Sequence, residues 1–380
     1  MFLIKTNPFK QCSESKLILC CNRNSVLTRC GIAATFCVVW MFLYLRELDI
    51  IGPEKTSFGE LHSHRGSEEI NVIRIQDLQW DPNATRWQES HSSLTDSYRM
   101  RSRFNHTVVT SYFRIKSKHS RNEYNTWMRN ILSMQDAMVI FTTPEEVDII
   151  KKLRGNVSGK TVVVTMHLNQ TRMLTYYNRT FWEVQHSKDN ESTFHNENLY
   201  VIWNEKTEFL KKTVDVNPFM SDFFAWIDFG YVRNTLHNGE MMLRNIPRDL
   251  KTDQVLMLDV TNLLGGTKMI GGGFIGGYAP GITRWHQEYY AVLDKNKDGF
   301  IGKDQAMMQV TCDNCPGLCK LIIPDNSQGN PWFYMTAYLS GRTTSQQFKQ
   351  IIWMFFTILS CILYLITMST KQCKRLSLVT

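Results

Sequence analysis

Short apolar runs alternate with helical patterns through the middle of the chain. Runs rich in β-branched or aromatic residues have the length of strands, and they occupy residues 107–113, 137–141, 161–165, 223–227, 255–258 and 320–323. Between them, apolar residues at three- and four-residue spacing predict helices over residues 124–132 and 280–293, and Thr143-Pro144 marks a further helix start. This alternation predicts an α/β fold with a mixed, mainly parallel sheet flanked by helices.

The pattern is clearest in residues 203–233. A helix is predicted there from apolar residues at three- and four-residue spacing, which are Trp203, Phe209, Leu210 and Val214. On the other side of this helix we expect the charged residues Glu205, Lys206, Lys211 and Lys212. Asn217-Pro218 ends the helix, because a residue before proline is pushed out of the helical region. The apolar run 223–227 is too short for another helix and predicts a buried strand.

Asp228 stands at the end of this predicted strand, with Gly230 close behind it. Open α/β sheets bind ligands outside the carboxyl ends of their strands, so Asp228 is a candidate ligand of a metal or a sugar nucleotide. The alternative is a structural role in a turn or a helix cap, where aspartate is common.

Three segments of the chain resemble the HtrL/YibB-like family, which occurs in bacteria and animals. They are YFRIKSKHSRNEYNTWMRN (residues 112–130), EKTEFL followed by NPFMSDFFAWIDFG (205–230) and GKDQ (302–305), and the resemblance runs from about residue 108 to residue 309. The activity of the family is unassigned. It is likened to glycosyltransferases of the GT-A fold, and its bacterial members are associated with lipopolysaccharide genes. The resemblance therefore implies a GT-A-like fold and transfer of a sugar from a nucleotide-sugar to a glycan or glycolipid.

Basic residues after the first predicted strand are candidates for holding the donor diphosphate. Arg114, Lys116 and Lys118 lie in a loop that follows a strand, and such loops often bind anions in parallel sheets. A solvated charged loop is the alternative. Gly272 and Gly273 belong to a glycine-rich stretch similar to the glycine-bearing turn near the acceptor sugar in GT-A enzymes, with a flexible loop as the alternative. We assign these basic residues and glycines to nucleotide-sugar binding.

The same resemblance makes Asp304 a candidate catalytic or sugar-binding carboxylate, with a helix N-terminal acid as the alternative. It also makes Asp228 a catalytic candidate and a candidate ligand of Mn or Mg. Hard oxygen ligands suit these ions, and a metal that bridges two phosphates stabilises charge on the departing nucleotide. Metal-dependent GT-A enzymes commonly show Asp-x-Asp at this strand end, whereas Phe229 and Gly230 follow Asp228 here. This departure weakens the prediction of a metal.

Two other functions are compatible with the same residues. A non-catalytic GT-A-like lectin or membrane scaffold would keep the fold and would not depend on Asp228. A glycoside hydrolase would use Asp228 and Asp304 as paired carboxylates about 5–10 Å apart. A basic cleft beside Asp228 would favour the transferase over both.

Apolar stretches near the two ends predict a membrane protein. Residues 31–48 follow a basic leader and form an anchor, with a cleaved signal peptide as the alternative. Residues 350–370 carry no charge and are long enough to span a bilayer, with a buried core helix as the alternative. Basic residues place both tails, 1–30 and 371–380, in the cytosol. We therefore expect a stem at 49–104, with a short ordered piece around residues 70–78 and with an N-terminal subdomain as the alternative. A lumenal domain is expected at 105–342, in the Golgi or endoplasmic reticulum.

Charge, sequons and cysteines are compatible with this topology. The net charge of +8 lies partly in the tails, and the chain has no basic-aromatic motif typical of nucleic-acid binding. N-glycosylation sequons lie between the two predicted spans, at Asn83, Asn105, Asn156, Asn169, Asn178 and Asn190. In an oxidising lumen, Cys312, Cys315 and Cys319 are expected to form a local disulfide and to leave one thiol, which is free or forms an intermolecular bridge.

Overall fold

The structure is a computed structural model of the 380-residue chain. It describes residues 70–77, 104–116, 119–233, 242–341 and 360. Contacts divide the chain into two units, Gly66–Ile351 and Met1–Arg65 with Ile352–Thr380, and the sheet and its helices belong to the first. Apart from Ser360, the predicted spans and tails lie outside the described residues, as does most of the predicted stem. None of the described helices is long and apolar enough to cross a membrane.

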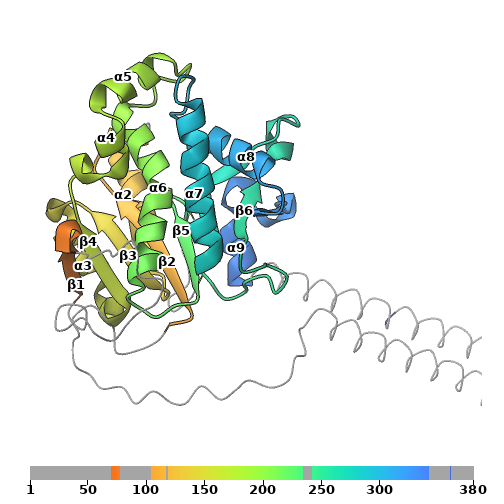
Figure 1. Ribbon diagram of the computed structural model, residues 1–380. Coiled ribbons are helices and arrows are strands. Elements are labelled where there is room, and N and C mark those ends of the chain that lie inside the picture. Colours follow the sequence, from red (N-terminus) through yellow and green to blue (C-terminus); the bar gives the residue numbers. More distant parts are fainter. Residues whose placement is uncertain (1–69, 78–103, 117–118, 234–241, 342–359, 361–380) are drawn as a thin grey trace, which may run out of the picture. The chain divides into compact units, whose positions relative to one another are not determined.

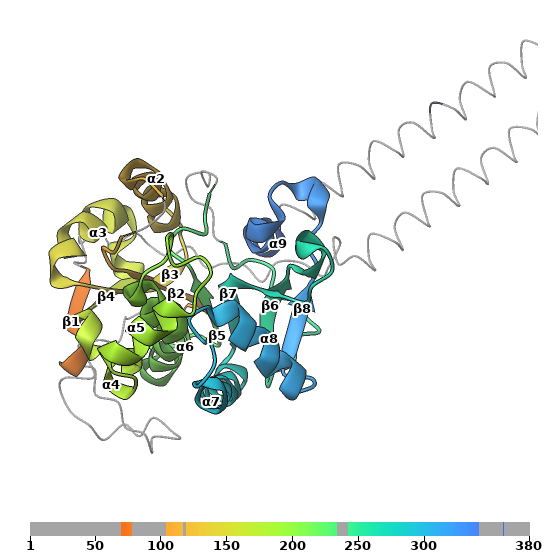
Figure 2. The ribbon, with the colours of Figure 1, turned by 90° about the horizontal axis from the view of Figure 1, so that it is seen from above.

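The described strands form one eight-stranded sheet in the order β1-β4-β3-β2-β5-β7-β6-β8, seen from above in Figure 2. They are β1 (Asn71–Arg74), β2 (His106–Tyr112), β3 (Ala137–Thr142), β4 (Thr161–Thr165), β5 (Phe223–Ile227), β6 (Val255–Asp259), β7 (Ile270–Tyr278) and β8 (Cys319–Ile322). Neighbours pair in parallel except for β7, which is antiparallel to β5 and β6. The predicted mixed, mainly parallel sheet is confirmed, and the short ordered piece expected near residue 70 is β1.

Helices cover both faces of the sheet (Figure 2). One face carries α2 (Arg121–Leu132), α3 (Val147–Arg154) and α9 (Tyr334–Ser340). The other carries α4 (Arg172–Tyr176), α5 (Arg179–Ser187), α6 (Glu197–Val216), α7 (Ala279–Asn296) and α8 (Asp304–Asn314). Short 3-10 helices complete the elements: Ile75–Asp77, Pro144–Glu146, Gly155–Lys160, Leu168–Gln170, Thr261–Leu264, Asn326–Gln328 and Pro331–Phe333. Each face buries an apolar core of its own, so the sheet is covered on both sides.

The longest described helix, α6, has clear signals at both ends. Asn196 is its N-cap, and the side chain accepts a hydrogen bond from the backbone of Leu199. Asn217 ends the helix in the left-handed conformation with φ of 39°. The predicted end is confirmed, whereas the helix begins at Glu197, well before the first residue of the apolar pattern, Trp203.

The middle of α6 is buried on every side. Glu205 and Lys206 are each 1% exposed, and Glu208 is 8% exposed. Figure 1 shows α6 in front of the sheet, with α7 beside it, and α4 and α5 also pack against it. The prediction of a polar side is therefore wrong for Glu205 and Lys206. Glu205 is covered by α4, where it accepts hydrogen bonds from the backbone, and Lys206 faces the sheet, where it donates to the carbonyl of Gly272.

The glycine-rich stretch is a strand, and the predicted turn or flexible loop is wrong. It forms β7, which lies between β5 and β6. A Cβ on Gly273 would lie 2.3 Å from the Tyr231 ring, and one on Gly272 would lie 2.9 Å from Asp304 Oδ2. Glycine is favoured at these positions because the side chains of Tyr231 and Asp304 lie too close to β7 for a Cβ atom to fit without a shift.

A disulfide joins Cys312 in α8 to Cys319 at the start of β8, and Cys315 is free. The expected local disulfide is confirmed. It connects α8 to the edge of the sheet, because β8 pairs only with β6 among the described strands.

Candidate functional site

The order of the strands reverses direction at β2. From β2 the chain adds β3 and β4 on one side, and it later returns to add β5 on the other side. In open α/β sheets, ligands bind outside the carboxyl ends of the strands at such a switch point. Because β2 ends at Tyr112 and β5 ends at Ile227, the segments that begin with Phe113 and Asp228 emerge at this position.

A buried lysine joins the two predicted carboxylates beside the switch point. Lys206 Nζ lies 3.1 Å from Asp228 Oδ1 and 2.8 Å from Asp304 Oδ2. It also donates a hydrogen bond of 2.8 Å to the carbonyl of Gly272. The four residues come from α6, the end of β5, the first turn of α8 and β7. We call Lys206, Asp228 and Asp304 the lysine–carboxylate site.

The two carboxylates of this site differ in access to solvent. The side chain of Asp228 is 35% exposed, whereas that of Asp304 is 5% exposed. Asp228 Oδ1 also accepts a hydrogen bond of 2.7 Å from Trp226 Nε1, and none of the described residues bonds its Oδ2. Asp304 is the first residue of α8, as the alternative of a helix N-terminal acid requires. Asp228 is therefore the carboxylate that a ligand can reach, and Asp304 lies behind Lys206.

Burial and pairing set the charge of the buried groups. Burial lowers the pKa of Lys206, but Asp228 and Asp304 outweigh this effect and hold its pKa above the ordinary value. Burial raises the pKa of Asp304, and Lys206 offsets only part of that rise. The 2.8 Å contact is an ion pair without hydrogen-bond alignment, since Asp304 Oδ2 is buried and has no hydrogen-bond partner among the described residues. Lys206 thus remains a positive charge inside the protein, stabilised by its two partners.

The sheet backbone fixes Asp228 and Gly272 relative to each other. The backbone N–H of Asp228 donates to the carbonyl of Gly273, which extends the pairing of β5 with β7 by one step. Gly272 and Gly273 therefore contact the lysine–carboxylate site through backbone carbonyls. In this structure the two predicted glycines form the wall behind the site.

The predicted basic residues lie in the loop after β2. Arg114 is 60% exposed and pairs with the buried Glu146 at 2.8 Å. Lys116 is exposed, and its carbonyl accepts a hydrogen bond from Asn196. Lys118 lies outside the described residues. Arg114 is thus held at the switch point by Glu146, with most of its side chain in solvent.

A further arginine at this end of the sheet was missed in the sequence. The guanidinium of Arg233 lies 3.3 Å from the ring centre of Trp127 and 4.7 Å from that of Phe333. Burial lowers its pKa, with smaller opposing effects that include the charge of Asp228. Its Nε is buried and has no hydrogen-bond partner in the described part of the chain. A guanidinium held between two rings is positioned in advance for an anion.

Asp228 offers limited ligation to a metal. Hard cations need several oxygen ligands, and Mg commonly takes one or two carboxylates together with substrate phosphates. Within the described residues, Asp228 supplies one free oxygen, and the Lys206 ammonium stands between it and Asp304. These residues fit a metal held by Asp228 and a bound diphosphate, but they do not form a complete protein cage.

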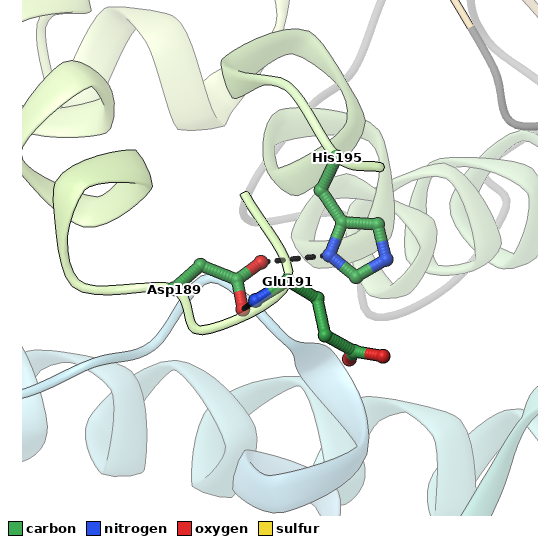
Figure 3. Close-up of side chains that lie close together, drawn as sticks. All are labelled: Asp189, Glu191 and His195. Atoms are coloured by element: carbon green, nitrogen blue, oxygen red, sulfur yellow. Dashed lines mark hydrogen bonds and ion pairs between the residues drawn. The ribbon is translucent and has the colours of Figure 1, made fainter. Parts of the chain in front are cut away.

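A second acidic cluster lies in the segment that follows α5 (Figure 3). Asp189, Glu191 and His195 bring one ligand atom each within 4.8 Å of one another. Asp189 is already bonded, since Oδ2 accepts from His195 Nδ1 at 2.7 Å and from Tyr200 at 2.7 Å. The ammonium of Lys303 lies 3.2 Å from Asp189 Oδ1 and also contacts Glu191. This cluster is an ion-pair network with a lysine in the place of a cation.

Glu205, the neighbour of Lys206 in α6, makes the stability of the fold depend on pH. Its two oxygens accept backbone hydrogen bonds of 2.9 Å from Arg172 and Met173. Burial, together with the nearby Glu208, raises its pKa to about 8 from an ordinary value of 4.5. Between pH 4.5 and pH 8, the Glu205 carboxyl group is therefore ionised in the unfolded chain and protonated in the folded chain. The contribution of Glu205 to stability is therefore largest below pH 4.5 and falls as the pH rises towards 8.

We expect Glu205→Gln to remove this pH dependence. In the wild-type chain, Glu205 should lower the free energy of unfolding by up to about 1.4 kcal/mol per pH unit within that window. Urea denaturation of both chains at pH 5, 6, 7 and 8 measures the difference in slope. The exposed Glu183→Gln is the control, and it should keep the wild-type slope. Equal slopes for Glu205→Gln and the wild type would show that Glu205 is ionised in the folded chain.

Comparisons with known proteins identify a matching family and several solved structures of low sequence identity. The family described as "Bacterial protein of unknown function (HtrL_YibB)" matches residues 104–336. No curated protein matches the chain.

Similar solved structures include glycosyltransferases. Mouse xyloside xylosyltransferase 1 in its apo form is 10% identical, with 57% of this chain and 84% of that chain covered and a TM-score of 0.36. Core-mannan synthase A from Aspergillus fumigatus, in its Mn/GDP form, is 12% identical, with 64% and 81% covered and a TM-score of 0.36. PaToxG glycosyltransferase is 8% identical, with 62% and 76% covered and a TM-score of 0.31. Because these TM-scores are low, evidence for an activity has to come from the site and not from these structures.

Proposed function

The chain belongs to the HtrL_YibB family, and on that premise we propose that it transfers a sugar from a nucleotide-sugar to a glycan or glycolipid. The observation that carries the proposal is the lysine–carboxylate site beside the switch point of the sheet. Such a position binds ligands in open α/β sheets, and here it combines a reachable carboxylate with a buried positive charge. The family resemblance to GT-A glycosyltransferases supplies the reaction class.

The exposure of each residue indicates its role in the site. Asp228 faces the ligand, and Lys206 fixes its orientation from behind. Asp304, which is 4% exposed, acts through Lys206 as a positioning residue. Arg114 and Arg233 provide positive charge for the diphosphate, because guanidinium groups bind phosphate oxygens in a bidentate manner. The departing nucleotide carries negative charge, which fixed cations stabilise.

Asp228 would hold a Mn or Mg ion together with the bound diphosphate, and such an ion would supply positive charge that neutralises part of the diphosphate charge. The protein supplies one free carboxylate oxygen for this purpose among its described residues. The positive charges of Lys206, Arg114 and Arg233 are present without a metal. Donor binding should therefore survive removal of the metal, with reduced affinity.

A hydrolase with paired carboxylates fits this geometry less well. Both carboxylates are ion-paired with the same lysine, at 3.1 and 2.8 Å. A glycosidase needs one carboxylic acid in contact with the leaving oxygen, and a second carboxylate that acts as base or nucleophile. Asp304 is too buried to meet a substrate in either role.

We also propose that the domain works on the lumenal side of a Golgi or endoplasmic reticulum membrane. The two apolar stretches, the sequons and the Cys312–Cys319 disulfide support this placement, since disulfides persist in oxidising compartments. Treatment with an N-glycosidase should lower the apparent mass of the chain isolated from secretory cells. An unchanged mass would count against lumenal exposure of the sequons.

The test of the transferase is donor binding by the purified full-length chain. We expect one class among UDP-, GDP- and CMP-sugars to raise the melting temperature, because a ligand that binds only the folded state stabilises it. At a free concentration of about 100 times Kd, the expected stabilisation is about 2.7 kcal/mol. Each donor is measured with Mn and with a chelator. The absence of any shift in a folded sample would contradict the proposal.

Two arginine variants locate the bound donor. Arg233→Met should weaken the shift, because it removes the guanidinium between Trp127 and Phe333. Arg129→Met changes an exposed arginine of α2 and should leave the shift unchanged. Equal shifts in both variants would place the diphosphate away from Arg233.

A further inference from the structure

A cavity of about 330 Å³ opens between α4 and α7. It lies within the size range of small-molecule sites, which is roughly 300–1,000 Å³. The side chains that matter in it are Arg172, Tyr176, Tyr177, Tyr290 and Asp294. None of the three residues of the lysine–carboxylate site lines it. We call it the α4/α7 cavity.

Aromatic rings provide its apolar surface. Tyr176 is 57% exposed, so most of one large ring is available to a ligand. Tyr177 packs edge-on against Tyr176, with ring centres 4.8 Å apart, and keeps the exposed ring in place. Rigid rings of this kind supply contact area at little cost in conformational entropy.

Two charged groups of the cavity are held in fixed positions. Asp294 accepts hydrogen bonds from the hydroxyl groups of Tyr176 and Tyr177, at 2.9 and 3.0 Å. The guanidinium of Arg172 lies 4.4 Å from the ring centre of Tyr290. Its Nε is buried and has no hydrogen-bond partner among the residues that the structure describes. The cavity therefore presents a fixed acceptor and a fixed donor beside an exposed ring.

The charges select against simple ions. A cation would meet Arg172 and the ammonium of Lys297, which lies 3.6 Å from Asp294. An anion would meet Asp294 and also Glu208, which lies 3.7 Å from Arg172. A purely apolar ligand would remove water from the carboxylate and the guanidinium and would offer neither group a further hydrogen bond, which is costly. A neutral ligand with one apolar face and several hydroxyl groups satisfies all of these groups.

We propose that the α4/α7 cavity binds a neutral saccharide unit. The C–H face of a pyranose ring would stack on Tyr176, and its hydroxyl groups would donate to Asp294 and accept from Arg172. Helix α6 separates the cavity from the lysine–carboxylate site. Its Glu208 contacts Arg172 and His286 in the cavity wall, whereas its Lys206 belongs to the site. The proposal does not depend on transferase activity, since it rests on different residues.

Binding of the full-length chain to an array of neutral oligosaccharides tests the proposal. The array carries glucose, galactose, mannose, xylose and N-acetylhexosamine units, and the best oligosaccharide is then titrated by calorimetry. We expect Tyr176→Ala to raise its Kd by at least about tenfold, because the ring is the main contact surface. Phe194→Ala is the matched control, since Phe194 is 60% exposed and lies outside the cavity. The control should bind with the wild-type Kd.

A second variant tests whether oligosaccharide binding is independent of the lysine–carboxylate site. Asp228→Asn should retain oligosaccharide binding, whatever it does to nucleotide-sugars. Loss of oligosaccharide binding in Asp228→Asn with full binding in Tyr176→Ala would overturn the proposal. The absence of binding to every oligosaccharide on the array, in a chain that melts cooperatively, would also overturn it. Neither result depends on whether a nucleotide-sugar binds.

Discussion

Lys206→Met is expected to lower the free energy of unfolding by about 3–5 kcal/mol. The substitution keeps most of the apolar stem and removes the ammonium that lies within 3.1 Å of both Asp228 and Asp304. Asp304 would then be a buried carboxylate without its ion-pair partner, and the Gly272 carbonyl would lose its donor. The loss is large because breaking a buried ion pair on one side leaves the other charge uncompensated.

Urea denaturation at pH 7 measures this loss, and a second lysine of the same helix is the control. Lys211 pairs with Asp215 near the surface, and its side chain is 16% exposed. Lys211→Met should cost about 1 kcal/mol, since both partners of this pair still reach solvent and no fully buried charge is left behind. Combining Lys206→Met with Asp304→Asn should recover part of the stability, because the unpaired charge is gone. Equal losses for Lys206→Met and Lys211→Met would contradict the central place of Lys206 in the fold.

Most of the sheet was predictable because most of its strands are local runs of apolar or β-branched residues with clear ends. Residues 223–227, for example, are apolar throughout and stop at a charged residue, and β5 covers the same residues. Their parallel pairing followed from the helical patterns between them. The antiparallel β7 was missed because glycine is depleted in strands, so its glycine-rich sequence indicated a loop. Only the closeness of Tyr231 and Asp304 explains why glycines stand there.

Lys206 was misplaced for a different reason. It is three residues from both Trp203 and Phe209, so helical spacing puts it on the same side as these apolar residues. Its charge suggested the opposite side, because lysine is almost never fully buried unless it is paired. The partners that make burial possible, Asp228 and Asp304, come from distant parts of the sequence. Pairing over such separations is not visible in a local pattern.

The candidate site was therefore predictable in part. Asp228 followed from its place at the end of an apolar run, and Asp304 from the family resemblance, and the structure brings the two together through Lys206. Arg233 left one signal, since it stands five residues after Asp228 in the same stretch. Its position between Trp127 and Phe333 depends on packing of α2 and the C-terminal segment. The α4/α7 cavity also needs two distant helices and left no signal in the local sequence.

Asp228→Asn is expected to lower kcat/KM for sugar transfer by about 100-fold or more, the scale seen when one preorganised electrostatic contact is removed. Asparagine keeps the size of the side chain and the hydrogen bond from Trp226, but it removes the negative charge that faces the ligand. Stability should change much less, because Asp228 is 35% exposed and Lys206 keeps Asp304 as a partner. Release of the nucleoside diphosphate from the donor that binds measures the rate.

The matched control for this variant is Asp259→Asn, at the end of β6. Asp259 also ends a strand of the same sheet, but its Oδ1 accepts a hydrogen bond from the backbone of Thr261, as expected of a turn residue. It should therefore keep the wild-type kcat/KM. A fall in activity confined to Asp228→Asn, in a chain that still folds, would separate a functional carboxylate from a structural one. Wild-type activity in Asp228→Asn would instead reduce Asp228 to a structural partner of Lys206, and the negative charge required for transfer would have to come from another residue.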